Sequence, residues 1–253
     1  MEHSGHDVDH LLKRWRSLAD RHGWKVTLLL EVDGLPVLAI ENGKPGDRAT
    51  YLSAGIHGDE CAPIWALLQW AENASEAELA QPLLIFPCLN PHGIVGNTRR
   101  DQDGIDLNRS FHRGSVRLVS AWKEFLGERQ FDFALNLHED YDATGIYLYE
   151  LVRGESVGHQ LLDCCEELIP REPSNEVEGR EFDNGLMMAA GEDVREIIKE
   201  DLEDEWPEAI YLCLEHNAHS MTFETPSELG LALRIATQRR FIESVVEMRS
   251  KQD

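Results

Sequence analysis

The stretch that decides the fold runs from Asn90 to Phe111 and reads NPHGIVGNTRRDQDGIDLNRSF. It has the composition of a loop, carries three arginines and shows neither helical nor strand periodicity. Three further pieces of sequence also place polar residues at the end of an apolar run: Gly55–Glu60, Leu135–His138 and Met221–Pro226. We interpret the four pieces as parts of one site.

Length and composition suit one α/β domain. With 253 residues, of which 42% are hydrophobic, the chain can bury a full core, so we expect a single domain over residues 1–253. The formal net charge of −23 argues against nucleic acid and against an anionic membrane surface as partners, because a field of that sign repels both. The simplest role of this acidity is solubility.

Cysteine usage and the N-terminus bear on the compartment. The five cysteines are scattered through apolar contexts and form no pair of CxxC motifs of the kind that binds structural zinc. The N-terminus lacks the basic and apolar regions of a signal peptide, and no apolar run is long enough to span a membrane. These features predict free thiols in a reducing, cytoplasmic setting.

Hydrophobic periodicity predicts strands that alternate with helices. Helices are expected at 7–22, 61–71, 115–128, 155–168 and 227–248, and strands at 24–30, 35–40, 50–54, 82–89, 131–137, 145–151, 209–214 and 220–223. This order indicates an α/β fold with a largely parallel or mixed sheet flanked by helices. In open α/β sheets, ligands bind beyond the carboxyl ends of the strands, which is where the four polar pieces fall.

Two segments lie outside this alternation. Residues 1–45 are expected to form an N-terminal helix and a hairpin. Residues 171–208 are interrupted by proline and glycine and become acidic between Glu192 and Glu205. This acidic insertion could cover a substrate, or it could be a solvated helix with loops, since a charge run is usually an exposed face.

The loop after the strand at 50–54 contains candidate metal ligands. His57 and Glu60 lie three residues apart and could bend toward one cation, which His138 could join from another strand end. Two histidines and a glutamate are a ligand set of catalytic zinc sites, which keep the fourth position for water, so we expect one Zn²⁺ ion. The spacing of His57 and Glu60 on its own also fits an ordinary loop histidine and a solvated glutamate.

Glu224 is the candidate general base, because it follows an apolar segment and precedes a break in the strand. Such a carboxylate can take the proton of a zinc-bound water and pass it to a leaving group. The alternative is an edge-strand glutamate that faces solvent. Glu139 and Asp140 are rivals, but a residue next to the ligand His138 seldom points to the same place, so we expect structural roles for them.

The stretch Asn90–Phe111, which we call the opening stretch, supplies cations and a side-chain amide. Arginine forks bind carboxylates, and fixed cations stabilise oxyanions. We expect Arg99 to lie over the scissile carbonyl oxygen, and Asn108 with Arg109 to hold a substrate carboxylate. Taken alone, these residues also fit turn positions and surface charges.

Taken together, the pieces resemble the zinc metallocarboxypeptidases of the M14 type, which include the carboxypeptidase A and murein peptide amidase A branches. The residues that match, in the order and approximate spacing of that family, are Gly55–Glu60, Asn90–Phe111, His138 and Thr222–Glu224. The segment Asp106–Arg109 is the most specific part of the resemblance. It implies a single domain with a mixed sheet of about eight strands flanked by helices.

The resemblance also implies roles for particular residues. It implies zinc binding by His57, Glu60 and His138, a carbonyl-polarising Arg99 with Arg100 as a shifted alternative, a carboxylate held by Asn108 and Arg109, and Glu224 as general base. The implied function is hydrolysis of a peptide or small amide next to a free C-terminal carboxylate. The tyrosine that closes on the substrate in carboxypeptidase A has no clear match, and Tyr141, Tyr147 and Tyr211 are the candidates.

The aspartoacylases and succinylglutamate desuccinylases form a related branch, which is similar in the same residues and hydrolyses small N-acyl amino acids. Those enzymes carry a further β-rich domain after the glutamate, whereas only the helix-patterned residues 227–253 follow Glu224 here. We therefore favour a metallocarboxypeptidase and keep the N-acyl amino acid amidohydrolase as the alternative. A zinc-containing peptide-binding module without catalysis is a third hypothesis.

Overall fold

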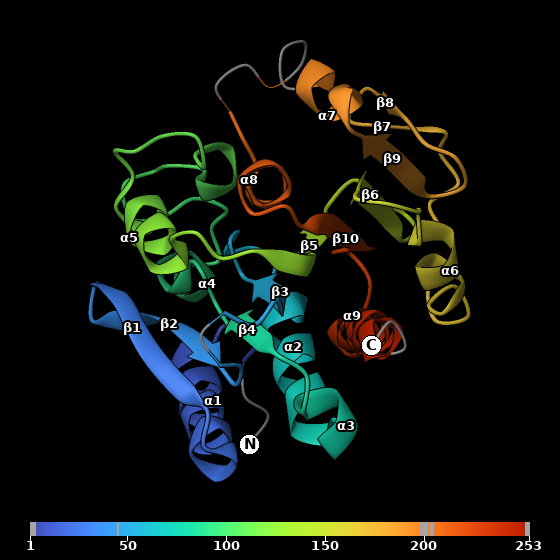
Figure 1. Cartoon of the computed structure of the whole chain (residues 1–253). Coiled ribbons are helices and arrows are strands. Elements are labelled where there is room, and N and C mark those ends of the chain that lie inside the picture. The colour runs from blue at the N-terminus through green and yellow to red at the C-terminus, as the bar shows by residue number, and fades with distance from the viewer. Residues whose placement is uncertain (1–3, 45, 198–201, 203–204, 251–253) are drawn as a thin grey trace.

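The computed structural model describes residues 4–44, 46–197, 202 and 205–250, and it contains a mixed eight-stranded sheet flanked by helices (Figure 1). The strands are ordered β1-β2-β4-β3-β5-β10-β6-β9. They run at Lys25–Val32 (β1), Leu35–Glu41 (β2), Ala49–Ala54 (β3), Leu83–Phe86 (β4), Phe131–Asp140 (β5), Tyr147–Val152 (β6), Leu186–Ala190 (β9) and His219–Pro226 (β10). The predicted single-domain α/β fold with a mixed sheet of eight strands is confirmed.

Two layers of helices cover the sheet. One layer consists of α1 (Val8–His22), α2 (Ala62–Asn73), α6 (Gly158–Asp163) and α9 (Leu231–Ser250), with the short α3 (Glu76–Leu79) beside α9. The other face packs against α5 (Arg117–Leu126) and α8 (Glu208–Glu215). Central strands covered on both faces need apolar side chains on both, which explains the almost wholly buried runs of β4, β5 and β10.

The topology brings the four polar pieces to one edge of the sheet. Strands β4, β3, β5 and β10 are parallel in this order, so they all end at the same edge. The loop after β3 carries His57 and Glu60, and Asn90 follows β4. Within the sheet, His138 of β5 is in register with Glu224 of β10.

The segment between α6 and α8 contains the last strand of the sheet, β9, which lies next to β6. It forms a two-stranded ribbon, β7 (Glu176–Val177) and β8 (Arg180–Glu181), before β9 pairs with β6 and α7 (Glu192–Ile197) follows. Figure 1 shows these elements together at one side of the molecule. Of the predicted acidic run at 192–205, residues 198–201 and 203–204 lie outside the described part of the chain.

Two sequence predictions were wrong. Residues 209–214 belong to helix α8 and do not form a strand. This run is short and mostly apolar, so its period does not distinguish a buried helix from a buried strand. The stretch 90–111 is not wholly loop, because it contains α4 (Pro91–Gly96) and a 3₁₀ turn, η1 (Leu107–Arg109). The Asn90 side chain caps α4 by accepting from Gly93 N.

Among the residues that the structure describes, no helix combines the length and the apolarity needed to cross a membrane.

Candidate metal centre and catalytic cleft

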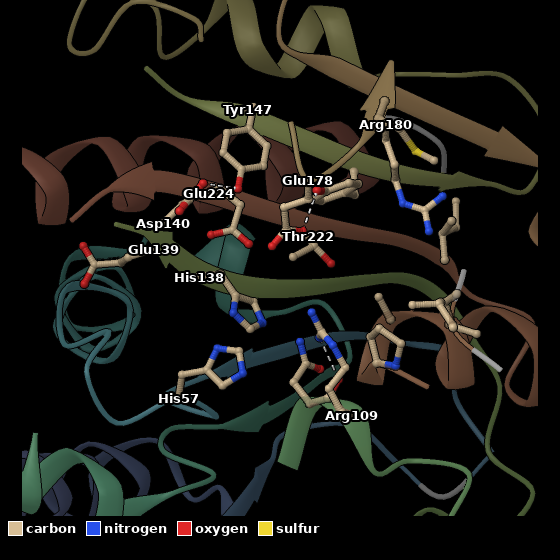
Figure 2. Close-up of a pocket in the computed structure, with 18 of the residues that line it drawn as sticks. His57, Arg109, His138, Glu139, Asp140, Tyr147, Glu178, Arg180, Thr222 and Glu224 are labelled. Atoms are coloured by element: carbon tan, nitrogen blue, oxygen red, sulfur yellow. Dashed lines mark hydrogen bonds between the residues drawn. The ribbon is translucent and has the colours of Figure 1, made fainter. Parts of the chain in front are cut away.

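Three buried side chains at the carboxyl edge of the sheet could hold a metal ion. One ligand atom each from His57, Glu60 and His138 lie within 4.8 Å of one another. His57 Nδ1 is 2.5 Å from Glu60 Oε1, and His138 Nδ1 is 2.9 Å from Glu60 Oε2. The two imidazole rings face the same space in Figure 2. Two imidazole nitrogens and a carboxylate suit zinc and similar divalent transition metals, so the donor set fits the predicted ion.

The loop that carries two of these residues rests directly on the opening stretch. Gly58 packs so closely on α4 that a Cβ at this position would lie 1.9 Å from the carbonyl carbon of Gly93. Gly58 N also donates to Thr98 O at 3.0 Å. The opening stretch supplies none of the three clustered side chains, yet its backbone positions His57 and Glu60.

Further polar groups orient the cluster. Asp106 Oδ1 lies 3.2 Å from His57 Nε2, and this contact leaves His57 Nδ1 directed at the cluster. The backbone N–H of Glu139 donates to Glu60 Oε2 at 3.1 Å. Burial favours neutral His57, but the Glu60 charge and the hydrogen bonds to Asp106 and Glu60 outweigh it and raise the pKa of His57 to about 9.

Glu224 faces the cluster from the neighbouring strand (Figure 2). Its side chain is almost fully buried, and its Oε2 has no hydrogen-bond partner among the described residues. Burial raises the pKa of Glu224 well above its usual value; the charge of His138 opposes this shift and that of Glu60 adds to it. A buried carboxylate oxygen without a protein partner is available to bond a water or a substrate.

The two acids beside His138 are engaged elsewhere. Glu139 Oε1 pairs with Arg234 Nη1 at 2.5 Å, and Glu139 Oε2 accepts from Ala62 N at 2.9 Å. Asp140 Oδ2 accepts from the Tyr147 hydroxyl at 2.8 Å. These contacts tie β5 to α9, α2 and β6.

Arg99 and Arg100 point to different places. Arg99 Nε donates to Asp106 Oδ2 at 2.9 Å, and Arg99 Nη1 lies 3.6 Å from Glu60 Oε1. Arg100 Nη1 donates to Gly104 O at 2.9 Å. Arg99 lines the same cleft as His57, Glu60 and His138, whereas Arg100 lines a neighbouring cavity.

Asn108 and Arg109 line the same cleft, and Figure 2 shows Arg109 across it from Glu224. Asn108 Oδ1 accepts from Glu208 N at 2.9 Å, and among the described residues the Nδ2 donor of this amide is left for a ligand. Arg109 Nη1 donates to Asn108 O at 3.1 Å. All seven site residues selected from the sequence therefore line one cleft: His57, Glu60, Arg99, Asn108, Arg109, His138 and Glu224.

A buried carboxyl group lies beneath Asn108. Glu208 accepts hydrogen bonds from the Tyr51 hydroxyl and, at 3.1 Å, from Ser53 Oγ. Trp122 Nε1 in turn donates to the Tyr51 hydroxyl at 2.9 Å. Burial raises the pKa of Glu208, although the hydrogen bond from Tyr51 opposes this shift.

The cleft has a volume of about 870 Å³ including its open mouth. The insertion at 171–208, for which we expected either a substrate cover or a solvated helix with loops, contributes Glu178 and Arg180 of the β7–β8 ribbon to the lining. Tyr149 also lines the cleft, and its hydroxyl donates to Glu178 Oε2 at 3.0 Å. Part of the wall is apolar, formed by Leu151, Met187, Ile197, Leu202, Ala209 and Ile210.

The three tyrosine candidates lie in different environments. Tyr147 is buried in the wall of the cleft on β6. Tyr141 is 72% exposed and is not part of the lining. Tyr211 packs edge-on against Trp122 on the α5 side of the sheet, with ring centroids 5.6 Å apart. Of the three, only Tyr147 is part of the lining of the cleft.

Asp106 could have been found from the sequence, because it opens the Asp106–Arg109 segment that carried the resemblance. Its partner His57 lies 49 residues away, so the pairing itself has no local signal. No sequence pattern marks Glu178, Arg180 or Glu208, which reach the site only through the ribbon and the unexpected helix α8.

Comparison with known proteins agrees with this fold. A sequence model of the succinylglutamate desuccinylase/aspartoacylase catalytic domain matches residues 47–168. No curated protein matches the chain. A protein from Shewanella denitrificans OS217, provisionally named a metallopeptidase, has a similar structure with a TM-score of 0.82 at 17% identity, over 96% of this chain and 91% of that one.

Two metallo-carboxypeptidases of known structure share the fold. The enzyme from Burkholderia cenocepacia has a TM-score of 0.69 at 15% identity, over 95% of this chain and 68% of that one. The enzyme from Pseudomonas aeruginosa, in complex with (2-guanidinoethylmercapto)succinic acid, has a TM-score of 0.66 at 14% identity, over 95% and 69% of the two chains.

The chain therefore has the fold of these metallopeptidases and metallo-carboxypeptidases. The family match covers 122 of the 253 residues, from β3 to the turn after α6.

Proposed function

We propose that the protein is a zinc-dependent metallocarboxypeptidase, which hydrolyses a peptide or small amide bond next to a free carboxylate. The observation that carries the proposal is the convergence of His57, Glu60 and His138 within 4.8 Å at the base of a cleft that Glu224 and Arg109 also line. In this proposal the first three residues are the metal ligands, Glu224 is the base and Arg109 receives the substrate carboxylate, and all of them line one cleft. A binding module without catalysis would not need the base.

His57, Glu60 and His138 would hold one Zn²⁺ ion. When bound there, zinc supplies a Lewis acid that lowers the pKa of a bound water to near 7. Asp106 keeps the His57 ring in the orientation that directs Nδ1 inward. The mutual contacts of the three side chains fix this arrangement in the fold.

The remaining residues handle the substrate and its protons. Arg109 and the Nδ2 donor of Asn108 bind the carboxylate, which sets the register of the substrate in the cleft. Arg99 stabilises negative charge on the scissile carbonyl oxygen. Glu224 Oε2 takes a proton from the attacking water and returns it to the leaving nitrogen, and its burial makes it a stronger base than a solvated carboxylate.

A second candidate function is hydrolysis of an N-acyl amino acid, and the family match at residues 47–168 favours it. Both reactions cleave an amide bond beside a carboxylate, and the same residues would serve in both. They differ in the acyl side of the substrate, which is a peptide in one case and a small acid in the other.

Metal analysis and a substrate panel test the proposal. The purified protein should contain about one zinc per chain, and it should release a C-terminal residue from N-blocked dipeptides with a free carboxylate. C-terminally amidated versions of the same dipeptides are the matched control, and we expect at least roughly tenfold lower kcat/KM for them.

The outcomes separate the hypotheses. Hydrolysis of N-acetyl and N-succinyl amino acids without hydrolysis of dipeptides would favour the second function. A zinc-loaded protein that binds peptides without cleaving any compound of the panel would favour the binding module.

A further inference from the structure

A second cavity lies beside the catalytic cleft and shares Arg109 with it. It has a volume of about 720 Å³ including its open mouth. Its lining consists of Arg100, Gly104, Ile105, Asp106, Arg109, Arg113 and Glu205. We call it the arginine cavity.

Among the described residues, the direct contacts of its three arginines leave part of their charge uncompensated, although the charge of Arg109 also acts on Asp106 and lowers the pKa of that carboxyl. Arg100 Nη1 donates to Gly104 O at 2.9 Å, and Arg109 Nη1 donates to Asn108 O at 3.1 Å. Carbonyl oxygens orient a guanidinium group but carry no net charge to neutralise it. Arg113 Nη2 lies 3.9 Å from Glu205 Oε1, and that carboxylate is 59% exposed, so this ion pair is long and screened by solvent.

The other acid in the lining is already used. Asp106 Oδ1 bonds His57 Nε2 and accepts from Asn108 N, and Asp106 Oδ2 accepts from Arg99 Nε. Counted over the described lining residues, three arginines face the two acids Asp106 and Glu205, so this part of the cavity keeps an excess of positive charge in a chain whose formal net charge is −23. Guanidinium forks match the paired oxygens of carboxylate, sulfate and phosphate groups, which makes such a cavity selective for oxyanions.

We propose that the arginine cavity is an oxyanion-binding subsite in which Arg100, Arg109 and Arg113 hold a carboxylate, sulfate or phosphate group. Its link to catalysis rests on the proposed function, because Arg109 is also the receptor for the substrate carboxylate. Two sources of the anion share this chemistry. A second acidic group of the substrate would add affinity, whereas a free inorganic anion would compete for Arg109 and weaken substrate binding.

Isothermal titration calorimetry of the zinc-loaded full chain with sulfate tests the subsite. Chloride keeps the ionic strength constant, so that general screening does not imitate binding. Arg113→Gln should weaken sulfate binding roughly tenfold, which corresponds to about 1.4 kcal/mol. Arg117→Gln is the matched control, because it removes the same charge from an exposed residue outside the arginine cavity. Arg117→Gln should bind sulfate as the wild type does.

Equal sulfate affinity in the wild type, Arg113→Gln and Arg117→Gln would overturn the proposal. The proposal would also be overturned if chloride at the same ionic strength gave the same binding signal as sulfate. Circular dichroism of each variant shows whether the fold is intact, and Arg100→Gln provides a second substitution in the same cavity if Arg113→Gln does not fold.

Kinetics with a pair of substrates that differ only by glutamate and glutamine at the C-terminal residue identify the source of the anion. If the substrate provides it, Arg113→Gln raises KM for the glutamate substrate and leaves KM for the glutamine substrate unchanged. If a free anion provides it, sulfate raises KM for both substrates in the wild type and has less effect in Arg113→Gln. The absence of both effects would contradict the link to catalysis. If no substrate is hydrolysed, the proposed function fails, and calorimetry still decides whether the subsite exists.

Discussion

Glu224 differs from the other acids of the cleft in having a buried oxygen without a partner. Asp140 accepts from Tyr147, Glu178 accepts from Tyr149, and Glu139 is paired with Arg234. Each of these contacts holds two elements together and gives its carboxylate a structural use. The unpartnered Oε2 of Glu224 has no such use among the described residues, which is why we assign it the proton transfer.

Glu224→Gln should abolish turnover while zinc content stays at the wild-type level. Glutamine has nearly the same shape, but it cannot accept the proton of the attacking water, so we expect kcat to fall at least roughly 100-fold. Activity and metal content measured on the same sample provide the check. Glu228→Gln, an exposed neighbour, is the control and should retain full activity. A zinc-loaded Glu224→Gln protein with normal kcat would exclude Glu224 as the base.

Gly58→Ala should disturb the metal cluster without touching a ligand. The new Cβ would lie 1.9 Å from the carbonyl carbon of Gly93, so the backbone of the ligand loop must move. We expect zinc affinity to fall roughly 10- to 100-fold, as it does when groups that orient ligands are lost. Gly96→Ala is the control, because its Cβ would meet nothing closer than 3.6 Å. Competition with a chromogenic chelator measures both affinities, and equal values would contradict the positioning role of Gly58.

Single residues were accessible from the sequence where they lie at strand ends inside short motifs. His57, Glu60 and His138 could be selected because parallel strands end at one edge, and this edge brings distant residues together. Glu178 and Arg180 could not be selected, because their approach to the cleft depends on the pairing of a ribbon with only two residues in each strand.

At the scale of elements, helix α8 explains both a wrong prediction and an unexpected feature of the cleft. Its sequence, EAIYLCLE, is apolar enough for either a strand or a helix, and tertiary packing against β5 and β10 decides between them. Because α8 begins at Glu208, its first backbone N–H reaches Asn108 and orients that side chain. The carboxyl group of the same residue becomes buried beside Tyr51 and Ser53.

Glu208→Gln should change how the stability of the fold depends on pH. Because burial raises the pKa of Glu208 above its unfolded value, the folded state binds the proton more tightly. Its contribution to stability is fully present below the unfolded pKa and is lost as pH rises toward the folded pKa, with a slope of at most about 1.4 kcal/mol per pH unit. Glutamine does not titrate, so the variant should gain stability relative to wild type as pH rises above the unfolded pKa of glutamate, about 4.3.

Urea unfolding at a series of pH values measures this difference. The comparison with wild type removes the contribution of the other acids, which both proteins share. Parallel pH profiles for the two proteins would mean that Glu208 is ionised in the folded state and that Tyr51 and Ser53 stabilise the charge.

At the scale of the whole molecule, the cluster joins parts of the chain that are distant in sequence. Strand β3, helix α2 and strand β5 meet there, and the opening stretch is held to the same loop through Gly58. A ligand that binds only the folded arrangement stabilises the fold by mass action, since the unfolded chain separates His57 and Glu60 from His138. A bound metal should therefore contribute to the stability of the entire domain.

Chelation should lower the melting temperature of the wild-type protein. Zinc at 1,000 times its dissociation constant should stabilise the folded state by about 4 kcal/mol. For a domain of this size, that corresponds to a shift in melting temperature of roughly 10 °C. Calorimetric melting with and without a chelator measures the shift, and added zinc should restore it. His138→Gln removes one ligand, so its melting temperature should respond far less to the chelator. An identical response of the two proteins would show that the chelator acts away from the cluster, and no response in either would mean that the cluster holds no metal in solution.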